Sequence, residues 1–259
     1  MDSAALETVQ AWLREAPQIA VLTGAGVSAE SGVPTFRDAQ TGYWAQFRPE
    51  DMATEDGFRA QPALVWRWYQ HRRQLLQGVQ PNAAHLALAA FAQQHPGRLT
   101  LITQNVDGLH QRAGSADVLC LHGDLMEDRF LDLPRPCCHP DTVEAGDPPH
   151  CPRCGNLLRP GVVWFGEALP LATLEAAQRA ARRCALMLVV GTAGAVYPAA
   201  GLARLARDAG ARVVIVNPHA SELDPVAHAV LRGTAAQLLP MLLAPESMLP
   251  QSVGGPSGA

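Results

Sequence analysis

The chain has 259 residues, 48% of them hydrophobic and 17% charged, which is typical of a globular protein with one large core and space for a smaller module. Its formal net charge of −4 argues against nucleic-acid binding, because contacts with phosphates need a basic face. The chain contains neither an apolar run of the roughly 20 residues that span a membrane nor an N-terminal targeting signal, so we expect a cytoplasmic protein with no membrane partner.

Strand-like apolar runs alternate with helical patterns along most of the chain. Leu6, Val9 and Leu13 recur at helical spacing, and residues 19–22 then form a short apolar run that predicts a buried strand. Further strands are expected at 99–102, 118–121, 186–190 and 212–216, with helices that include 171–183 and 199–209. The alternation predicts an α/β fold, a Rossmann-like doubly wound parallel sheet with helices on both faces.

Two stretches interrupt this alternation. Residues 37–82 contain helically spaced aromatic residues and no expected strand. Residues 122–160 include a loop-rich segment of Pro, Cys and Gly that needs a stabilising cross-link, such as a bound metal ion. We expect them to form a small domain as a helical insertion and a zinc-ribbon-like insertion. Residues 1–36, 83–121 and 161–243 would then form the Rossmann-like domain, and 244–259 a disordered tail.

A glycine-rich turn follows the first expected strand. Residues 24–29 match the pattern G-x-G-x-x-G/A, in which backbone N–H groups approach a pyrophosphate at a helix N-terminus. A tight turn without a ligand would show the same pattern. An ordinary dehydrogenase would also place an acidic residue at a strand end about 20 residues later. Glu50 and Asp51 stand there without a strand, which disfavours an oxidoreductase.

Polar side chains follow two further expected strands. An amide, a carboxylate and an imidazole occur within residues 103–110, and His122 follows the run 118–121. The carboxyl ends of parallel strands are where an open α/β sheet builds a ligand site. Simpler interpretations are that Asp107 caps a helix and that His110 is structural. An imidazole at His122 would suit a base near neutral pH.

In this order, segments 24–37, 103–110 and His122-Gly123 resemble the motifs of sirtuins, the NAD-dependent protein-lysine deacylases, and the resemblance extends from about Ile19 to Leu239. It implies NAD as cofactor, His122 as the catalytic base and Asn105 as a second catalytic residue. Ala193 replaces a serine that is usual in the family. The cofactor-binding residues implied by the resemblance are Gly24, Ala25, Gly26, Ser28, Phe36, Arg37, Gln104, Asn105, Val106, Asp107, Gly191, Thr192, Ala193, Asn217, Pro218, His219 and Ala235.

The resemblance also implies roles toward an acyl-lysine peptide. Segment 161–167 resembles the strand that pairs with the substrate, with Val163, Phe165, Gly166 and Glu167 as its binding residues. Tyr69 and Arg72 stand three residues apart within a helical pattern, so they share a helix face and can converge on a carboxylate. They resemble the Tyr-x-x-Arg of class III sirtuins, which prefer succinyl-, malonyl- or glutaryl-lysine. A solvated helix face is the alternative.

Four cysteines lie close together in the sequence. Cys151 and Cys154 form a good half-site for zinc, and without a secretory signal metal binding is favoured over disulfides. The first C-x-x-C pair of the family falls on Phe130 and Leu133, which cannot bind metal. We therefore expect Cys137 and Cys138 to complete a structural zinc site, with His139 or His150 as alternative ligands, or a metal-free loop.

The resemblance implies a complete reaction. The acyl oxygen attacks the nicotinamide ribose, nicotinamide leaves, and His122 deprotonates a ribose hydroxyl, which yields lysine, nicotinamide and O-acyl-ADP-ribose. Two alternatives remain open, a protein ADP-ribosyltransferase and a non-catalytic NAD-sensing module. A sensor needs no base, so His122, Asn105 and Asp107 together favour an enzyme.

Overall fold

The computed structural model describes residues 3–33 and 52–244. Its main sheet has six parallel strands in the order β3-β2-β1-β6-β7-β8. The chain leaves β1 toward β2 on one side and returns through β6 on the other, so the strand order reverses between β1 and β6. Such a switch point opens a crevice at the carboxyl ends of the strands. The strands are β1 Ile19–Thr23, β2 Leu99–Thr103, β3 Leu119–Cys120, β6 Leu186–Val190, β7 Arg212–Val216 and β8 Ala229–Leu231.

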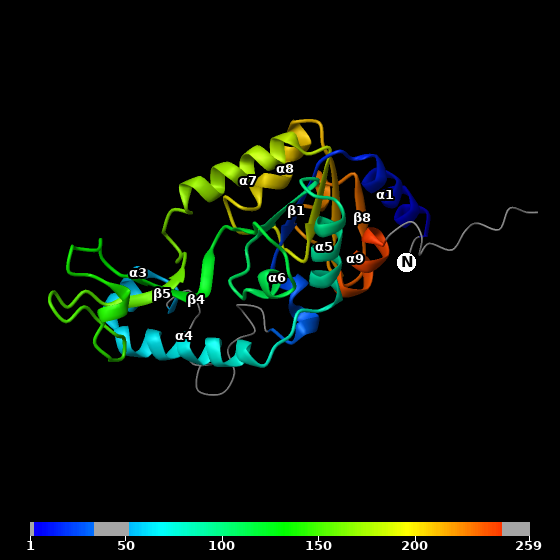
Figure 1. Ribbon diagram of the computed structural model, residues 1–259. Helices are drawn as coiled ribbons and strands as arrows, with labels where there is room; N and C mark the ends of the chain where they lie inside the picture. The colour runs from blue at the N-terminus through cyan, green and yellow to red at the C-terminus, as the bar shows by residue number, and fades with distance from the viewer. Residues whose placement is uncertain (1–2, 34–51, 245–259) are drawn as a thin grey trace, which may run out of the picture.

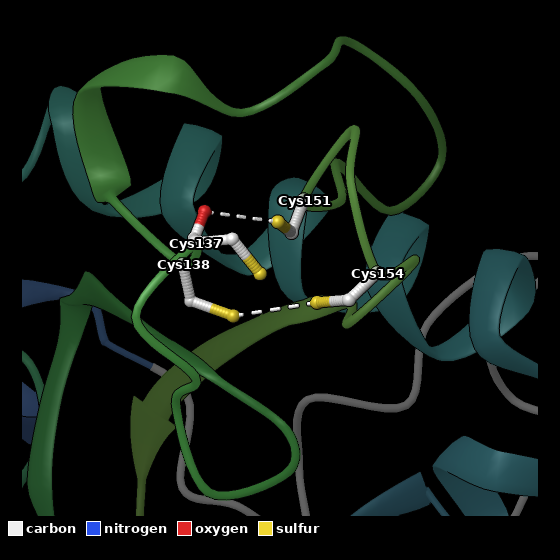
Figure 2. Close-up of side chains that lie close together, drawn as sticks. All are labelled: Cys137, Cys138, Cys151 and Cys154. Carbon is white, nitrogen blue, oxygen red and sulfur yellow. Dashed lines mark hydrogen bonds between the residues drawn. The ribbon is translucent and has the colours of Figure 1, made fainter.

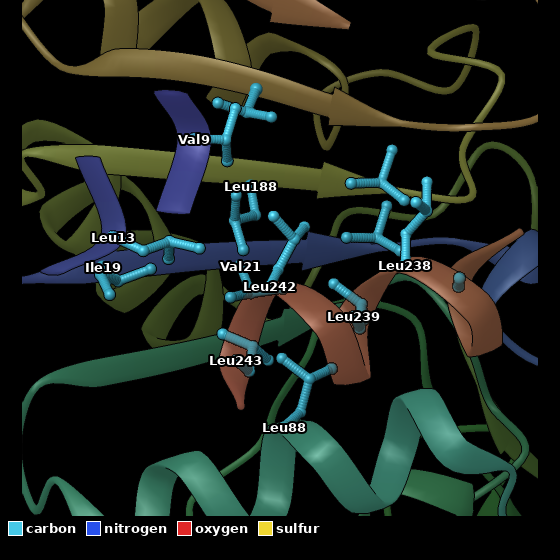
Figure 3. Packing of buried hydrophobic residues seen from close by; sticks show 14 of the residues in the cluster. Val9, Leu13, Ile19, Val21, Leu88, Leu188, Leu238, Leu239, Leu242 and Leu243 are labelled. Atoms are coloured by element: carbon cyan, nitrogen blue, oxygen red, sulfur yellow. The ribbon is translucent and has the colours of Figure 1, made fainter. Parts of the chain in front are cut away.

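Helices cover both faces of this sheet (Figure 1). Alternate residues of the central strands point to opposite faces, so Ile19 and Val21 enter one hydrophobic cluster while Ala20 and Leu22 enter another. The first cluster packs against leucines of α5 and α9 (Figure 3). The doubly wound parallel fold predicted from the sequence is therefore confirmed. The covering helices are α1 Ser3–Glu15, α5 Ala83–Gln94 and α9 Ala235–Leu243 on one face, and α7 Leu171–Arg183 and α8 Gly201–Asp208 on the other.

A third hydrophobic cluster lies outside the sheet. It joins α3 (Glu55–Ala60) and α4 (Pro62–Gln77) to an antiparallel pair, β4 (Gly123–Phe130) and β5 (Leu158–Val162), and it includes the buried ring of Trp164. The short elements are α6 Leu109–Arg112 and the 3₁₀ turns Ala25–Val27, Ala29–Ser31, Pro140–Thr142 and Asp224–Val226. Within the described ranges, no helix combines the length and the apolarity needed to cross a membrane.

The structure corrects two expectations in this second unit. The 122–160 insertion, expected to contain a loop-rich segment, also contains paired strands, with Phe130 opposite Leu158. The strand expected at 161–167 ends at Val162. It ends there because the Glu167 carboxylate accepts the N–H of Trp164 at 2.7 Å and the N–H of Glu167 bonds to the Trp164 carbonyl at 3.1 Å, which closes a turn.

Candidate active site

Two glycine turns meet at the switch point. Gly24 donates its N–H to the Val190 carbonyl at 3.0 Å, and Gly26 donates to the Gly191 carbonyl at 2.8 Å. A Cβ on Gly26 would lie 2.7 Å from the Gly191 Cα, so the backbones touch where a side chain would otherwise separate them. Ala25 is exposed at the tip of the first turn. A pyrophosphate site requires backbone of this kind, which lies at the end of a strand and carries almost no side chains.

Asn105 and Asp107 lie against the first glycine turn. The Asn105 amide donates to the Gly24 carbonyl and to the Ser28 hydroxyl, both at 3.2 Å. One oxygen of the buried Asp107 accepts from Ser28 at 2.7 Å, and the other accepts from the backbone N–H of Leu109 at 3.0 Å. Asp107 was considered as a helix cap, but the N-cap of α6 is Gly108 and Asp107 precedes it. Its bond to Leu109 does not exclude a ligand, because each carboxylate oxygen accepts more than one hydrogen bond.

His122 stands just beyond β3. Its Nδ1 lies 2.8 Å from the carbonyl oxygen of Gln104. A carbonyl only accepts, so in the neutral ring Nδ1 carries the proton and Nε2 holds the free lone pair. Burial lowers the pKa of His122, and the bond to Gln104 opposes this shift more weakly. The ring is therefore neutral at and above pH 7, with Nε2 able to accept a proton.

The remaining strand ends continue the same rim. The Gln104 side chain donates to the Thr192 hydroxyl at 3.2 Å, and the Asn217 amide donates to the Thr192 carbonyl at 2.9 Å. These bonds connect the ends of β2, β6 and β7 at one edge of the sheet. Of the other residues expected on the cofactor, Val106 is half-buried, Ala193, Pro218 and His219 are exposed, and Ala235 is buried at the start of α9.

A buried pair of histidines lies under this rim, and from the sequence only His110 was considered, as a structural residue, and not His85. The rings of His85 and His110 lie 4.8 Å apart, and burial lowers the pKa of both, that of His110 to about 3. Ser28 gives its proton to Asp107, so His85 Nε2 must donate to the Ser28 oxygen at 3.3 Å. The capping pattern Asn82-x-x-His85 before an apolar helix was the available signal.

Helix α4 carries the expected Tyr-x-x-Arg pair on one face. Tyr69 is buried, and burial raises the pKa of its phenol to about 12. The Arg72 guanidinium carbon lies 5.6 Å from the centre of the Tyr69 ring and 5.0 Å from that of Trp68. Burial lowers the pKa of Arg72, although a guanidinium stays charged in proteins. This face therefore combines a buried tyrosine with a half-buried arginine.

The turn after β5 lies beside His122. The Val163 N–H donates to the His122 carbonyl at 2.8 Å, the Phe165 N–H donates to Ala53 at 2.9 Å, and the Phe165 side chain is exposed. Glu167 accepts from Arg159 and Arg129, which lower the pKa of its carboxyl despite partial burial. Gly166 is exposed with φ +87°. The Glu167 carboxylate is thus held within the protein.

The four expected cysteines come together between β4 and β5 (Figure 2). Their sulfur atoms all lie within 4.8 Å of one another, and those of Cys138 and Cys154 are 3.5 Å apart. Tetrahedral zinc with Zn–S bonds of about 2.3 Å needs sulfurs about 3.8 Å apart. The set therefore fits zinc, and the adjacent Cys137 and Cys138 both reach the cluster. Phe36, Arg37, Glu50 and Asp51 lie outside the described residues.

Comparison with known proteins agrees with this geometry. The sequence model of the Sir2 family matches residues 24–198. An NAD-dependent protein deacylase of Ralstonia nicotianae is 56% identical over 245 residues, which cover 94% of this chain and 98% of the relative. A solved Sir2 homologue in complex with NAD superposes with a TM-score of 0.80 at 40% identity, covering 94% of this chain and 93% of that one. A Sir2 protein bound to an acetylated peptide superposes with a TM-score of 0.79 at 31% identity, covering 90% and 95%.

Proposed function

This chain belongs to the Sir2 family, and from that premise we propose that it is an NAD-dependent protein deacylase that prefers lysines carrying acidic acyl groups, such as succinyl, malonyl or glutaryl, and also acts on acetyl-lysine. The observation that carries the acyl preference is the buried Tyr69 beside Arg72 on one face of α4. The deacylase activity is supported by the similar Ralstonia protein, which is named as an NAD-dependent protein deacylase.

The rim of the sheet suits NAD. We assign the phosphates to the turn of Gly24, Ala25 and Gly26, where no side chain larger than a methyl group shields the backbone, and the adenosine half to the ends of β6 and β7. Asn105 and Asp107 would hold the nicotinamide ribose and amide. NAD supplies a ribose carbon open to attack and nicotinamide as the leaving group, so the acyl group passes to ADP-ribose.

In this proposal His122 moves the proton. Its Nδ1–H is held by the Gln104 carbonyl, which orients the ring and leaves Nε2 as the base. Nε2 would remove a proton from a ribose hydroxyl, which then attacks the acyl carbon. Addition of one solvent water would complete the release of the lysine amine and leave the acyl group on the ribose oxygen. Asn105 is anchored by Gly24 and Ser28 and would position the ribose beside this base.

The peptide would bind at the turn 163–167. The N–H groups of Val163, Trp164, Phe165 and Glu167 are already bonded within the protein, so pairing with an extended peptide rests on backbone carbonyls and on the N–H of Gly166. The exposed Phe165 side chain offers an apolar contact to the lysine stem. A zinc ion held by the four cysteines would stabilise the segment between β4 and β5, because the free energy of metal binding adds to the free energy of folding.

At the far end of the acyl-lysine, Arg72 would pair with the terminal carboxylate. Removing one partner of a buried charge pair costs about 2–5 kcal/mol, or roughly 30-fold to several thousandfold in kcat/KM. Arg72→Met should therefore abolish most desuccinylation while the same peptide carrying acetyl-lysine is affected far less. Arg67→Met is the matched control, because Arg67 lies on the same helix with its side chain 61% exposed.

Two outcomes would count against this proposal. If Arg72→Met lowers kcat/KM equally for both peptides, Arg72 does not recognise the carboxylate. If ADP-ribose appears on protein and no O-acyl-ADP-ribose forms, the chain is an ADP-ribosyltransferase. An NAD-sensing module would show NAD-dependent thermal stabilisation with no turnover at all.

A further inference from the structure

A buried hydrogen bond joins the acyl-recognition helix to the turn after β5. The indole Nε1 of Trp164 lies 2.9 Å from the hydroxyl oxygen of Tyr69, and both side chains are almost fully buried. An indole N–H can only donate. The Tyr69 oxygen is therefore the acceptor in this bond, and the phenolic proton must point elsewhere.

The direction of that proton has a chemical consequence. Among the residues that the structure describes, none accepts a hydrogen bond from the Tyr69 hydroxyl. Burial raises the pKa of the phenol to about 12, so the proton stays in place at any ordinary assay pH. The hydroxyl thus offers one donor, on the helix face that also carries the Arg72 guanidinium.

We propose that Trp164 is a positioning residue for acyl selectivity, because it occupies the acceptor side of the Tyr69 hydroxyl and leaves Tyr69 and Arg72 as donors to the acyl terminus. The proposal rests on the acyl preference argued above. A hydroxyl free to rotate can accept as readily as it donates, so it would serve neutral and anionic groups alike. Two donors favour a carboxylate, which accepts from both, over an acetyl group, whose methyl accepts from neither.

The indole is itself held firmly. The Arg159 guanidinium lies over the Trp164 ring, 3.2 Å from its centre, and is 2% exposed. Arg159 also pairs with Glu167, whose carboxylate accepts the backbone N–H of Trp164. Phe58 also packs against the indole, with 5.2 Å between the ring centres. The direction of the indole N–H is therefore set by its neighbours before any substrate binds.

The test is a double-mutant cycle on Trp164→Phe and Tyr69→Phe. The measured quantity is the ratio of kcat/KM for succinyl- over acetyl-lysine in one peptide sequence at saturating NAD. Tyr69→Phe should lower this ratio about tenfold or more, the effect of a lost charge-assisted bond, and Trp164→Phe about three- to tenfold. In the Tyr69→Phe background, Trp164→Phe should change the ratio less than twofold. In the wild-type background, the effect of Trp164→Phe should appear as a higher KM for the succinyl peptide.

A purely structural role gives a different pattern. If Trp164→Phe lowers both activities alike, or changes the ratio equally in both backgrounds, the inference is overturned. If Trp164→Phe does not fold, Tyr69→Phe decides alone, and an unchanged ratio overturns it. Arg72→Met run in parallel separates the two claims: a ratio that collapses with Arg72→Met but not with Trp164→Phe rejects only the inference, while a wild type without succinyl preference rejects the proposed function.

Discussion

Replacing His122 tests the proposed base most sharply. The 2.8 Å bond from Nδ1 to the Gln104 carbonyl leaves Nε2 as the only free base of the ring. Burial holds its pKa below the ordinary 6.5, so more than about nine-tenths of the molecules carry a neutral ring at pH 7.5. His122→Asn keeps an N–H donor near the position of Nδ1 and removes Nε2, and His122→Ala removes both.

Both variants should lose about hundredfold to ten-thousandfold in turnover, the usual contribution of a general base, or about 3–5 kcal/mol in the barrier. His122→Ala should also lose about 1 kcal/mol of folding stability with its hydrogen bond, a fall of about 2–4 °C in Tm that His122→Asn largely avoids. Single-turnover formation of O-acyl-ADP-ribose measures the chemical step, and the Tm shift caused by NAD shows whether the cofactor still binds.

The pH dependence gives a second readout of the same group. Protonation removes the lone pair of Nε2, so kcat/KM of the wild type should fall as the pH drops through a midpoint below 6.5. In His122→Asn this acid limb should vanish. Turnover close to wild type in either variant, or an acid limb that persists without His122, would refute the assignment.

The zinc cluster and the glycine turn give two further predictions. Protein purified without chelator should contain about one zinc per chain, and Cys154→Ser should lower both zinc content and Tm while Cys120→Ser, outside the cluster, changes neither; a zinc-free protein of full stability would contradict the site. Gly26→Ala places a Cβ 2.7 Å from Gly191 and should cost about 1–3 kcal/mol and raise KM for NAD, whereas Gly78→Ala has open space; an unchanged KM for NAD in Gly26→Ala would contradict the proposed phosphate turn.

The sequence predicts the central strands well for a physical reason. Residues 186–190 and 213–216 are short β-branched or leucine-rich runs whose side chains are buried on both faces of the sheet, so their hydrophobicity is continuous. β4 was not predicted, because its middle residues are exposed and polar, and it is held by pairing with β5 about thirty residues away. Local pattern cannot reveal such pairing.

In the site, too, residues that follow strands were predictable and contacts between distant elements were not. His122, Asn105 and Gly26 follow strands directly, so parallel topology alone predicts that they share an edge. The bond from Trp164 to Tyr69 joins residues 95 positions apart, and the pairing of Ser28 with His85 joins residues 57 apart. These partners lie in separate elements that meet only in the folded protein, so their contacts had no local signal. The grouping of Cys137 and Cys138 with the second cysteine pair was proposed from the sequence, and the structure brings all four together.

The most direct test of the proposed function is an acyl panel on the wild-type protein. One peptide sequence carrying succinyl-, malonyl-, glutaryl- or acetyl-lysine is incubated with NAD, and kcat/KM and the products are measured by mass spectrometry. The buried Tyr69 and the Arg72 guanidinium predict a higher kcat/KM for the acidic acyl groups than for acetyl, with nicotinamide and O-acyl-ADP-ribose formed in equal amounts. A higher kcat/KM for acetyl-lysine, or deacylation that proceeds without NAD, would contradict it.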